Sequence, residues 1–139
     1  MFYFVAPEVA GGLGPGSILD NNSFPPIVSV LEYRFDGWLG DDLLEVFPCF
    51  IVTRPLKEAL AKSSLTGFQF ANVLVSKSDT FDELYPGRNL PDFSWLQVKG
   101  KARLDDIGIT EDGRLVLSSQ TMKLLTNFNL HNAEISETP

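Results

Sequence analysis

The apolar residues of this chain come in short runs separated by glycine, proline and asparagine, and this pattern limits the fold more than any other feature. Ile27–Phe35 and Phe93–Val98 alternate between apolar and polar residues, as half-buried strands do. Asp112-Gly113, between two apolar runs, predicts a tight hairpin. Strands and long helices do not alternate regularly. We therefore expect an α+β fold with a mostly antiparallel or mixed sheet.

Two or three short helices are expected beside the strands. Pro55 follows an apolar run and suits the first turn of a helix, where its missing N–H costs little. Ser78 precedes a short helical segment that Pro86 ends, and Ser118 or Ser119 can cap the last helix. The last helix has apolar residues at helical spacing, namely Met122, Leu125 and Phe128.

The length of 139 residues predicts one domain, residues 1–139. The chain contains 11 Phe residues and is 44% hydrophobic, enough for a core without disulfides. Residues 11–26 are rich in Gly, Pro and Asn and predict a long loop, and residues 136–139 predict a frayed tail. No internal repeat is expected, although a strand that runs into a Ser-capped helix occurs twice.

The charge balance excludes several classes of partner. With 11 basic and 18 acidic residues the net charge is -7, which disfavours nucleic acids and anionic membrane surfaces and permits a cationic partner. No apolar stretch approaches the roughly 20 residues of a membrane span, and no signal peptide is recognised. The single cysteine, Cys49, cannot form an internal disulfide. We expect a cytoplasmic protein.

Catalytic and metal-binding patterns are weak. The glycine cluster Gly11–Gly16 lacks the Lys-Ser/Thr pair of a phosphate-binding loop, so we interpret it as a flexible loop. Cys49 lies in an apolar run, where burial would raise its pKa and make it inert. His131 is the only histidine, so a zinc site of the usual kind is not expected. We predict no catalytic residue, cofactor or metal.

Acidic doublets and one aromatic segment are the best surface candidates. Adjacent acids on a strand point to opposite faces, so each doublet is interpreted as a pair of solvated turn residues. The segment Tyr33–Asp42 places aromatic residues beside acids, as interface hot spots do. The alternative is that Trp38 folds back over a sheet edge. The predicted partner-binding residues are Asp36, Trp38, Asp41 and Asp42, with Asp105 and Asp106 as a second patch.

Residues 90–135 resemble a family. Phe93–Val98, Asp105-Asp106, Leu115–Ser119, Leu124-Leu125 and Phe128–Glu134 are similar to segments of small uncharacterised bacterial proteins that are grouped with immunity proteins of polymorphic toxin systems. The resemblance implies a cytoplasmic protein that binds and neutralises a cognate toxin without catalysis.

The sequence therefore predicts a non-catalytic protein-binding module, most concretely an immunity-type inhibitor of a protein partner such as a basic toxin domain. Two alternatives stay open. One is a small-ligand-binding or enzyme domain, in which His131, Cys49 or two acids from different segments converge on a pocket. The other is a structural subunit of a homo-oligomer. The sequence does not determine the oligomeric state or the order of the strands.

Overall fold

Each of the three helices begins at a serine or threonine that ends a strand or directly follows one. Thr53, Ser78 and Ser118 occupy the N-cap positions. The Ser78 and Ser118 hydroxyls each accept a hydrogen bond of 3.2 Å from a backbone N–H in the first helical turn. Pro55 stands in the first turn of its helix. The helix starts predicted from the sequence are therefore confirmed.

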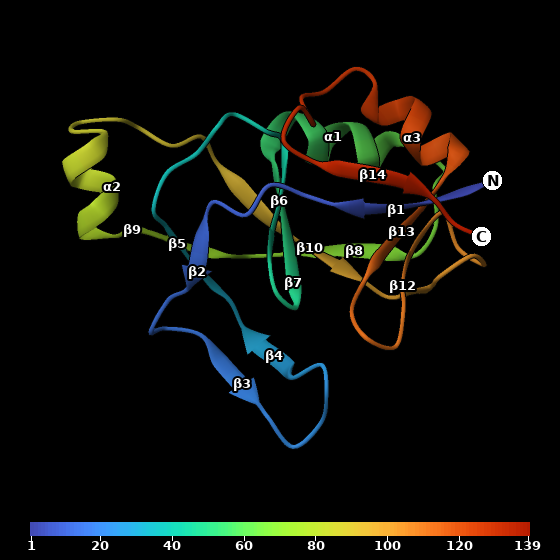
Figure 1. Cartoon of the computed structure of the whole chain (residues 1–139), viewed down its shortest axis with the longest axis horizontal. Coiled ribbons are helices and arrows are strands. Elements are labelled where there is room, and N and C mark those ends of the chain that lie inside the picture. The colour runs from blue at the N-terminus through green and yellow to red at the C-terminus, as the bar shows by residue number, and fades with distance from the viewer.

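The computed structural model describes all 139 residues, and they form one α+β domain, as predicted (Figure 1). The helices are α1 (Arg54–Lys62), α2 (Asp79–Leu84) and α3 (Ser119–Leu125). The strands are β1 (Phe2–Ala6), β2 (Gly11–Leu13), β3 (Ile18–Asp20), β4 (Ile27–Val30), β5 (Glu32–Phe35), β6 (Leu43–Val46), β7 (Cys49–Thr53), β8 (Phe68–Ala71), β9 (Leu74–Lys77), β10 (Phe93–Val98), β11 (Gly100–Lys101), β12 (Ile107–Ile109), β13 (Leu115–Ser118) and β14 (Glu134–Glu137). These strands pair antiparallel except β5–β9 and β11–β12.

Two sets of strands share the same order and pairing, although β1 comes first in the chain whereas its equivalent, β10, comes last in its unit. In the first unit the strand order is β6-β7-β10-β8, and α1 follows β7 directly. In the second unit the order is β12-β13-β1-β14, and α3 follows β13 directly. Every neighbouring pair of strands is antiparallel in both units. The fold thus contains an internal repeat, contrary to the expectation from the sequence.

The two units are joined to each other in the same way from both sides. The chain beyond β1 reaches Glu8, which forms a parallel bridge with Leu44 of β6. The chain beyond β10 forms β11, in which Gly100 pairs parallel with Gly108 of β12. Through these two connections the ring β1-β13-β12-β10-β7-β6 closes around the main core, and β8 and β14 pair on its outside edges.

Equivalent positions of the two units build this core. Leu43 pairs with Val52 in the first unit, and Ile107 pairs with Leu117 in the second. All four side chains are buried in the same cluster, which also contains residues of both helices. The equivalent pairs are Leu43 and Ile107, Phe50 and Leu115, Val52 and Leu117, Leu60 and Leu125, and Leu96 and Val5. Each buried side chain stabilises the fold by roughly 1.5–3 kcal/mol.

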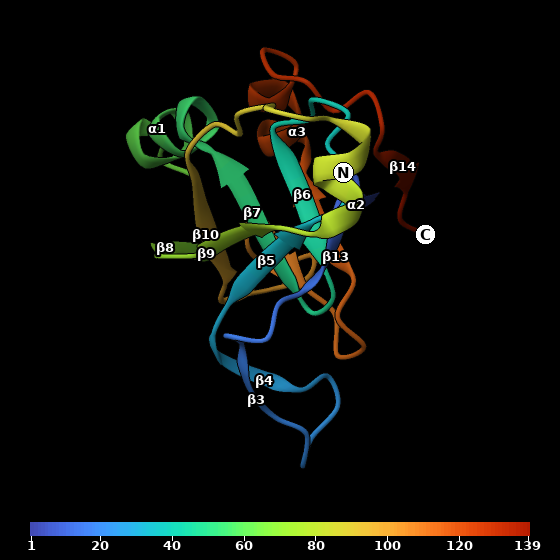
Figure 2. The ribbon, with the colours of Figure 1, turned by 90° about the vertical axis from the view of Figure 1, so that its left-hand side faces the viewer.

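The outer face of the first unit is covered by a second layer. Leu44, Ile51 and Trp95 point away from the main core and pack in a second buried cluster with Tyr33 and Phe35 of β5. Figure 2 shows β5 crossing in front of the β6 and β7 strands. The layer also contains β2, β9 and α2, since β5 pairs with β2 and β9 and the α2 residue Phe81 is buried in this cluster.

Residues 11–26, predicted to be a long loop, contain two strands. β2 pairs with β5, and a Cβ at Gly11 would stand 1.9 Å from the Arg34 carbonyl oxygen, so glycine is required there. β3 pairs with β4 in a hairpin that projects from the body of the molecule (Figures 1 and 2). We call residues 17–30 the arm. The predicted strand Ile27–Phe35 is broken at Leu31, because β4 belongs to the arm and β5 to the covering layer.

The predicted frayed tail is also partly ordered in the sheet. Ser136 and Glu137 pair with Phe4 and Tyr3 as part of β14. The Thr138 N–H donates to the Phe2 carbonyl at 3.0 Å. The two chain ends therefore lie side by side in the second unit (Figure 1). None of the helices is long and apolar enough to cross a membrane.

Candidate functional site

The acidic doublet Asp41-Asp42 stands at the start of β6 and holds the segment that follows α3. Asp42 accepts a hydrogen bond from the Thr53 hydroxyl at 2.6 Å and another from the Asn129 N–H at 2.7 Å. Thr53 is the N-cap of α1, in the first unit, whereas Asn129 lies beyond the helix of the second. Asp42 therefore ties the two units together.

The doublet Asp105-Asp106 stands at the equivalent place before β12 and makes the reciprocal connection. Asp106 accepts from the Ser118 hydroxyl at 2.8 Å and from the Thr66 N–H at 3.0 Å. Ser118 caps α3, in the second unit, and Thr66 lies beyond α1 of the first. We call these two sets of bonds the reciprocal clasps. They give both doublets an intramolecular role that sequence reasoning had not assigned to them.

The first aspartate of each doublet also accepts hydrogen bonds from within the chain. Asp41 is completely buried, and it accepts bonds of 2.9 Å from the Asn132 N–H and from the Asn132 Nδ2 group. The Glu8 carboxylate accepts from the Asp41 N–H at 3.3 Å, and burial raises the pKa of Glu8. Asp105 accepts from the Lys101 N–H at 2.8 Å. The prediction that Asp41 belongs to a partner-binding surface is therefore wrong, because no part of it is exposed.

Trp38 folds back over the structure, which was the alternative for this residue. Its Nε1–H donates to the Asp41 carbonyl at 2.9 Å, and its ring meets Phe93 edge-on with centroids 5.9 Å apart. The Arg88 guanidinium lies 5.3 Å from the centroid of the Trp38 ring. Asp36, by contrast, is exposed. The structure thus brings Trp38 and Asp41 together through a hydrogen bond within the chain.

The reciprocal clasps can be tested by truncating one acid at a time. Asp42→Ala and Asp106→Ala should each lower the free energy of unfolding by about 2–4 kcal/mol, because each leaves a hydroxyl and an N–H without their charged acceptor. Urea denaturation measures this. The exposed Asp36→Ala serves as the matched control, with an expected change below about 0.5 kcal/mol. Equal free energies of unfolding for all three variants would contradict the claim that the clasps stabilise the fold.

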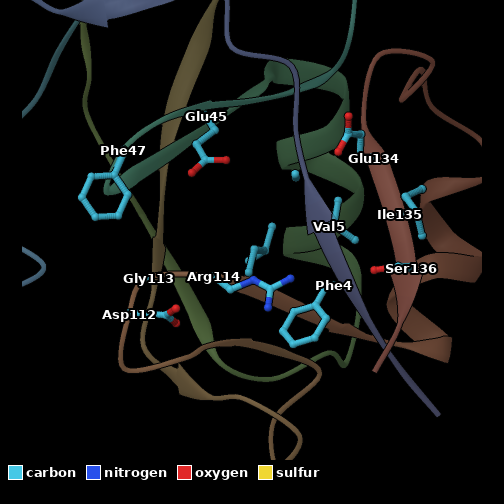
Figure 3. A pocket seen from close by; sticks show the side chains of 12 residues that line it. Phe4, Val5, Glu45, Phe47, Asp112, Gly113, Arg114, Glu134, Ile135 and Ser136 are labelled. Atoms are coloured by element: carbon cyan, nitrogen blue, oxygen red, sulfur yellow. The ribbon is translucent and has the colours of Figure 1, made fainter. Parts of the chain in front are cut away.

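An open groove lies where the outer face of the second unit meets the β6–β7 hairpin (Figure 3). Its volume is about 400 Å³. The side chains that define its chemistry are Phe4, Glu45, Phe47, Asp112, Arg114 and Glu134. We call this the groove. It combines aromatic rings with three carboxylates and one guanidinium.

Glu45 is the most unusual residue of the groove. It lies between two buried residues of β6, and its carboxylate enters no hydrogen bond or ion pair within the chain, since Arg54–Glu58 is the one ion pair of the structure. Burial raises the pKa of Glu45. Arg114 does not neutralise it, because its guanidinium is stacked on the Phe4 ring, 3.6 Å from the centroid. An acid kept half-buried without a partner is a candidate binding group.

The arm and the groove form one continuous surface. Phe24, at the arm's tip, packs against Phe47 at the rim of the groove, with ring centroids 5.8 Å apart. A Cβ at Gly113 would stand 2.9 Å from the Phe47 ring and 3.2 Å from Pro25, so tip, rim and the β12–β13 turn are in contact. The sequence offered one signal for this surface that we had not used, since Glu45 interrupts an otherwise apolar strand.

Cys49 and His131, the only cysteine and the only histidine, lie in different environments. Cys49 is buried in the second cluster, as expected, and burial raises the pKa of its thiol to about 12. His131 is exposed, and its backbone N–H donates to the Asn129 side chain. No group of three or more His, Cys, Asp or Glu side chains is placed to hold a metal ion. Cys49 and His131 therefore do not face a common pocket.

Comparison with family models, with curated proteins and with solved structures finds no match for this chain.

Neutralising Glu45 should stabilise the protein in a way that depends on pH. Because burial raises its pKa above that of the unfolded chain, the charged form costs stability at neutral pH. Glu45→Gln should raise the free energy of unfolding there, because it removes this charge. The gain should vanish below about pH 4, where the wild-type carboxyl is also protonated. Urea unfolding at both pH values is the measurement, and a pH-independent difference would contradict the assignment.

Proposed function

We propose that this protein is a non-catalytic binding module of the cytoplasm, an immunity-type inhibitor that neutralises a cognate toxin by contact. The observation that carries the proposal is the arm. Phe24, Ile27 and Ile18 are 74%, 61% and 58% exposed on a hairpin that projects from the domain. Large apolar side chains gathered on a projecting element mark interaction sites in soluble proteins.

The composition of the arm supports this reading. Asp20 is the one charged residue among residues 17–30, in a chain with a net charge of -7. A two-stranded hairpin is marginally stable without packing, and this hairpin leaves one apolar side chain of each strand, Ile18 and Ile27, largely in solvent. A partner that covers the arm would bury these side chains at a small desolvation cost, because almost no charge has to leave water.

The charge of the rest of the surface favours a basic partner. The arm meets the groove, whose acids outnumber its single guanidinium. An acidic surface speeds the encounter with a basic protein and disfavours nucleic acids. The resemblance of residues 90–135 to immunity proteins points in the same direction, since inhibition by covering a toxin requires no chemistry from the inhibitor.

The arm can be tested with substitutions that leave the core intact. Phe24→Ser and Ile27→Ser should each reduce capture of the native partner about tenfold or more, as expected of a binding hot spot. Leu84→Ser on α2 is the matched control, because Leu84 is 63% exposed and lies outside the arm. The measurement is quantitative mass spectrometry of proteins captured from the native lysate, together with growth rescue by co-expression with the toxic product of a neighbouring gene.

Circular dichroism should show the same fold and melting temperature for all three variants. Arm variants that capture the partner and rescue growth as well as the wild type would overturn the proposal. A stable dimer in solution that Phe24→Ser dissociates would also overturn it, in favour of a homo-oligomer.

A further inference from the structure

The repeat shows which surface of the second unit is left without a cover. Trp95 of the first unit pairs with Ile51 and Ala71, and Phe4 of the second unit pairs with Val116 and Ser136. Trp95 and Phe4 therefore occupy equivalent positions on the two outer faces. Trp95 is buried beneath the covering layer, whereas Phe4 lines the open groove.

The open face differs from its covered counterpart in charge. Cys49, on the covered face, corresponds to Arg114, since each directly precedes a core residue of the equivalent strands. Glu134 also lines the groove, opposite Ala6 in the sheet. Three carboxylates and one guanidinium line the groove, and the guanidinium is already stacked on Phe4. This face would therefore attract a cation from a partner.

We infer that the groove docks an arginine side chain of the partner protein, whose guanidinium pairs with the Glu45 carboxylate and stacks on Phe47. This inference rests on the proposed function and names the chemistry that the partner presents. Glu45 offers two oxygens to a guanidinium fork, and no group within the chain uses them. Phe47, 42% exposed at the rim, offers a ring face for the planar cation.

The chain itself contains a precedent for this geometry. The Arg114 guanidinium lies 3.6 Å from the centroid of the Phe4 ring on the same face. A second guanidinium beside Glu45 would repeat that stacking and add the ion pair that Arg114 does not make. Burial raises the pKa of Glu45, and an ion pair with a bound cation would lower that pKa again.

The test uses N-acetyl-arginine amide as the probe and its neutral analogue N-acetyl-citrulline amide as the comparison. Titration at low salt is followed by amide chemical shifts in NMR spectra of the full chain, because salt screens such contacts. The arginine probe should give saturable millimolar binding, with shifts at Phe4, Glu45 and Phe47. The citrulline probe should give none there.

Two variants identify the carboxylate that binds. Glu45→Gln should weaken binding of the arginine probe about fivefold or more, as expected for a partly exposed charged pair beside an aromatic ring. Glu83→Gln is the matched control, because it removes the same charge from an exposed position on α2 and should leave binding unchanged. Equal weakening by both variants, or equal binding of both probes, would overturn the inference.

The result is separable from the test of the proposed function. Loss of partner capture by the arm variants does not involve the probe, and probe binding does not require the partner. If arginine amide fails to bind while Phe24→Ser still abolishes capture, the groove assignment is wrong and the binding-module proposal stands.

Discussion

The rest of the structure depends on the reciprocal clasps. Asp42 and Asp106 each join the N-cap of one helix to the segment beyond the other helix, so neither unit can move without breaking bonds in both. Charged acceptors make hydrogen bonds roughly twice as strong as neutral ones. The clasps stand directly before β6 and β12, which lie in the ring of strands around the core.

Closure of the ring leaves two equivalent outer faces, and the chain covers only one of them. The covering layer, which includes β5 and α2, buries Trp95 and its neighbours on the first unit. No such layer lies over Phe4 and Arg114 on the second. The arm, which lies in the chain between β2 and β5 of the covering layer, ends at the rim of that face. Because the second face is not covered, the exposed apolar side chains of the arm lie beside a groove that contains the unpaired Glu45.

Local signals in the sequence predicted the elements well. Ser78 and Ser118 as caps, Pro55 in a first turn and Asp112-Gly113 as a hairpin turn are each decided by backbone chemistry within a few residues. The repeat was not visible, because its halves share positions and hydrogen bonds but few residues: Thr53 corresponds to Ser118, and Trp95 to Phe4.

The role of the acids could not be predicted, because their partners lie far away in the sequence. Asp42 meets Asn129 and Asp41 meets Asn132, and nothing at the doublet itself indicates those contacts. The arm was missed because β3 is only three residues long and is flanked by turn residues, so it is not recognised as a strand without β4 beside it.

Hydrogen–deuterium exchange of the chain, free and in the complex isolated from its native lysate, tests the central claim most directly, namely that the arm and the groove together form the partner surface. If they do, amide exchange should slow on binding at residues 18–30, at the β6–β7 turn and at β14, with α2 unchanged. Protection confined to α2 and the Trp38 segment, with the arm exchanging as in the free protein, would contradict it.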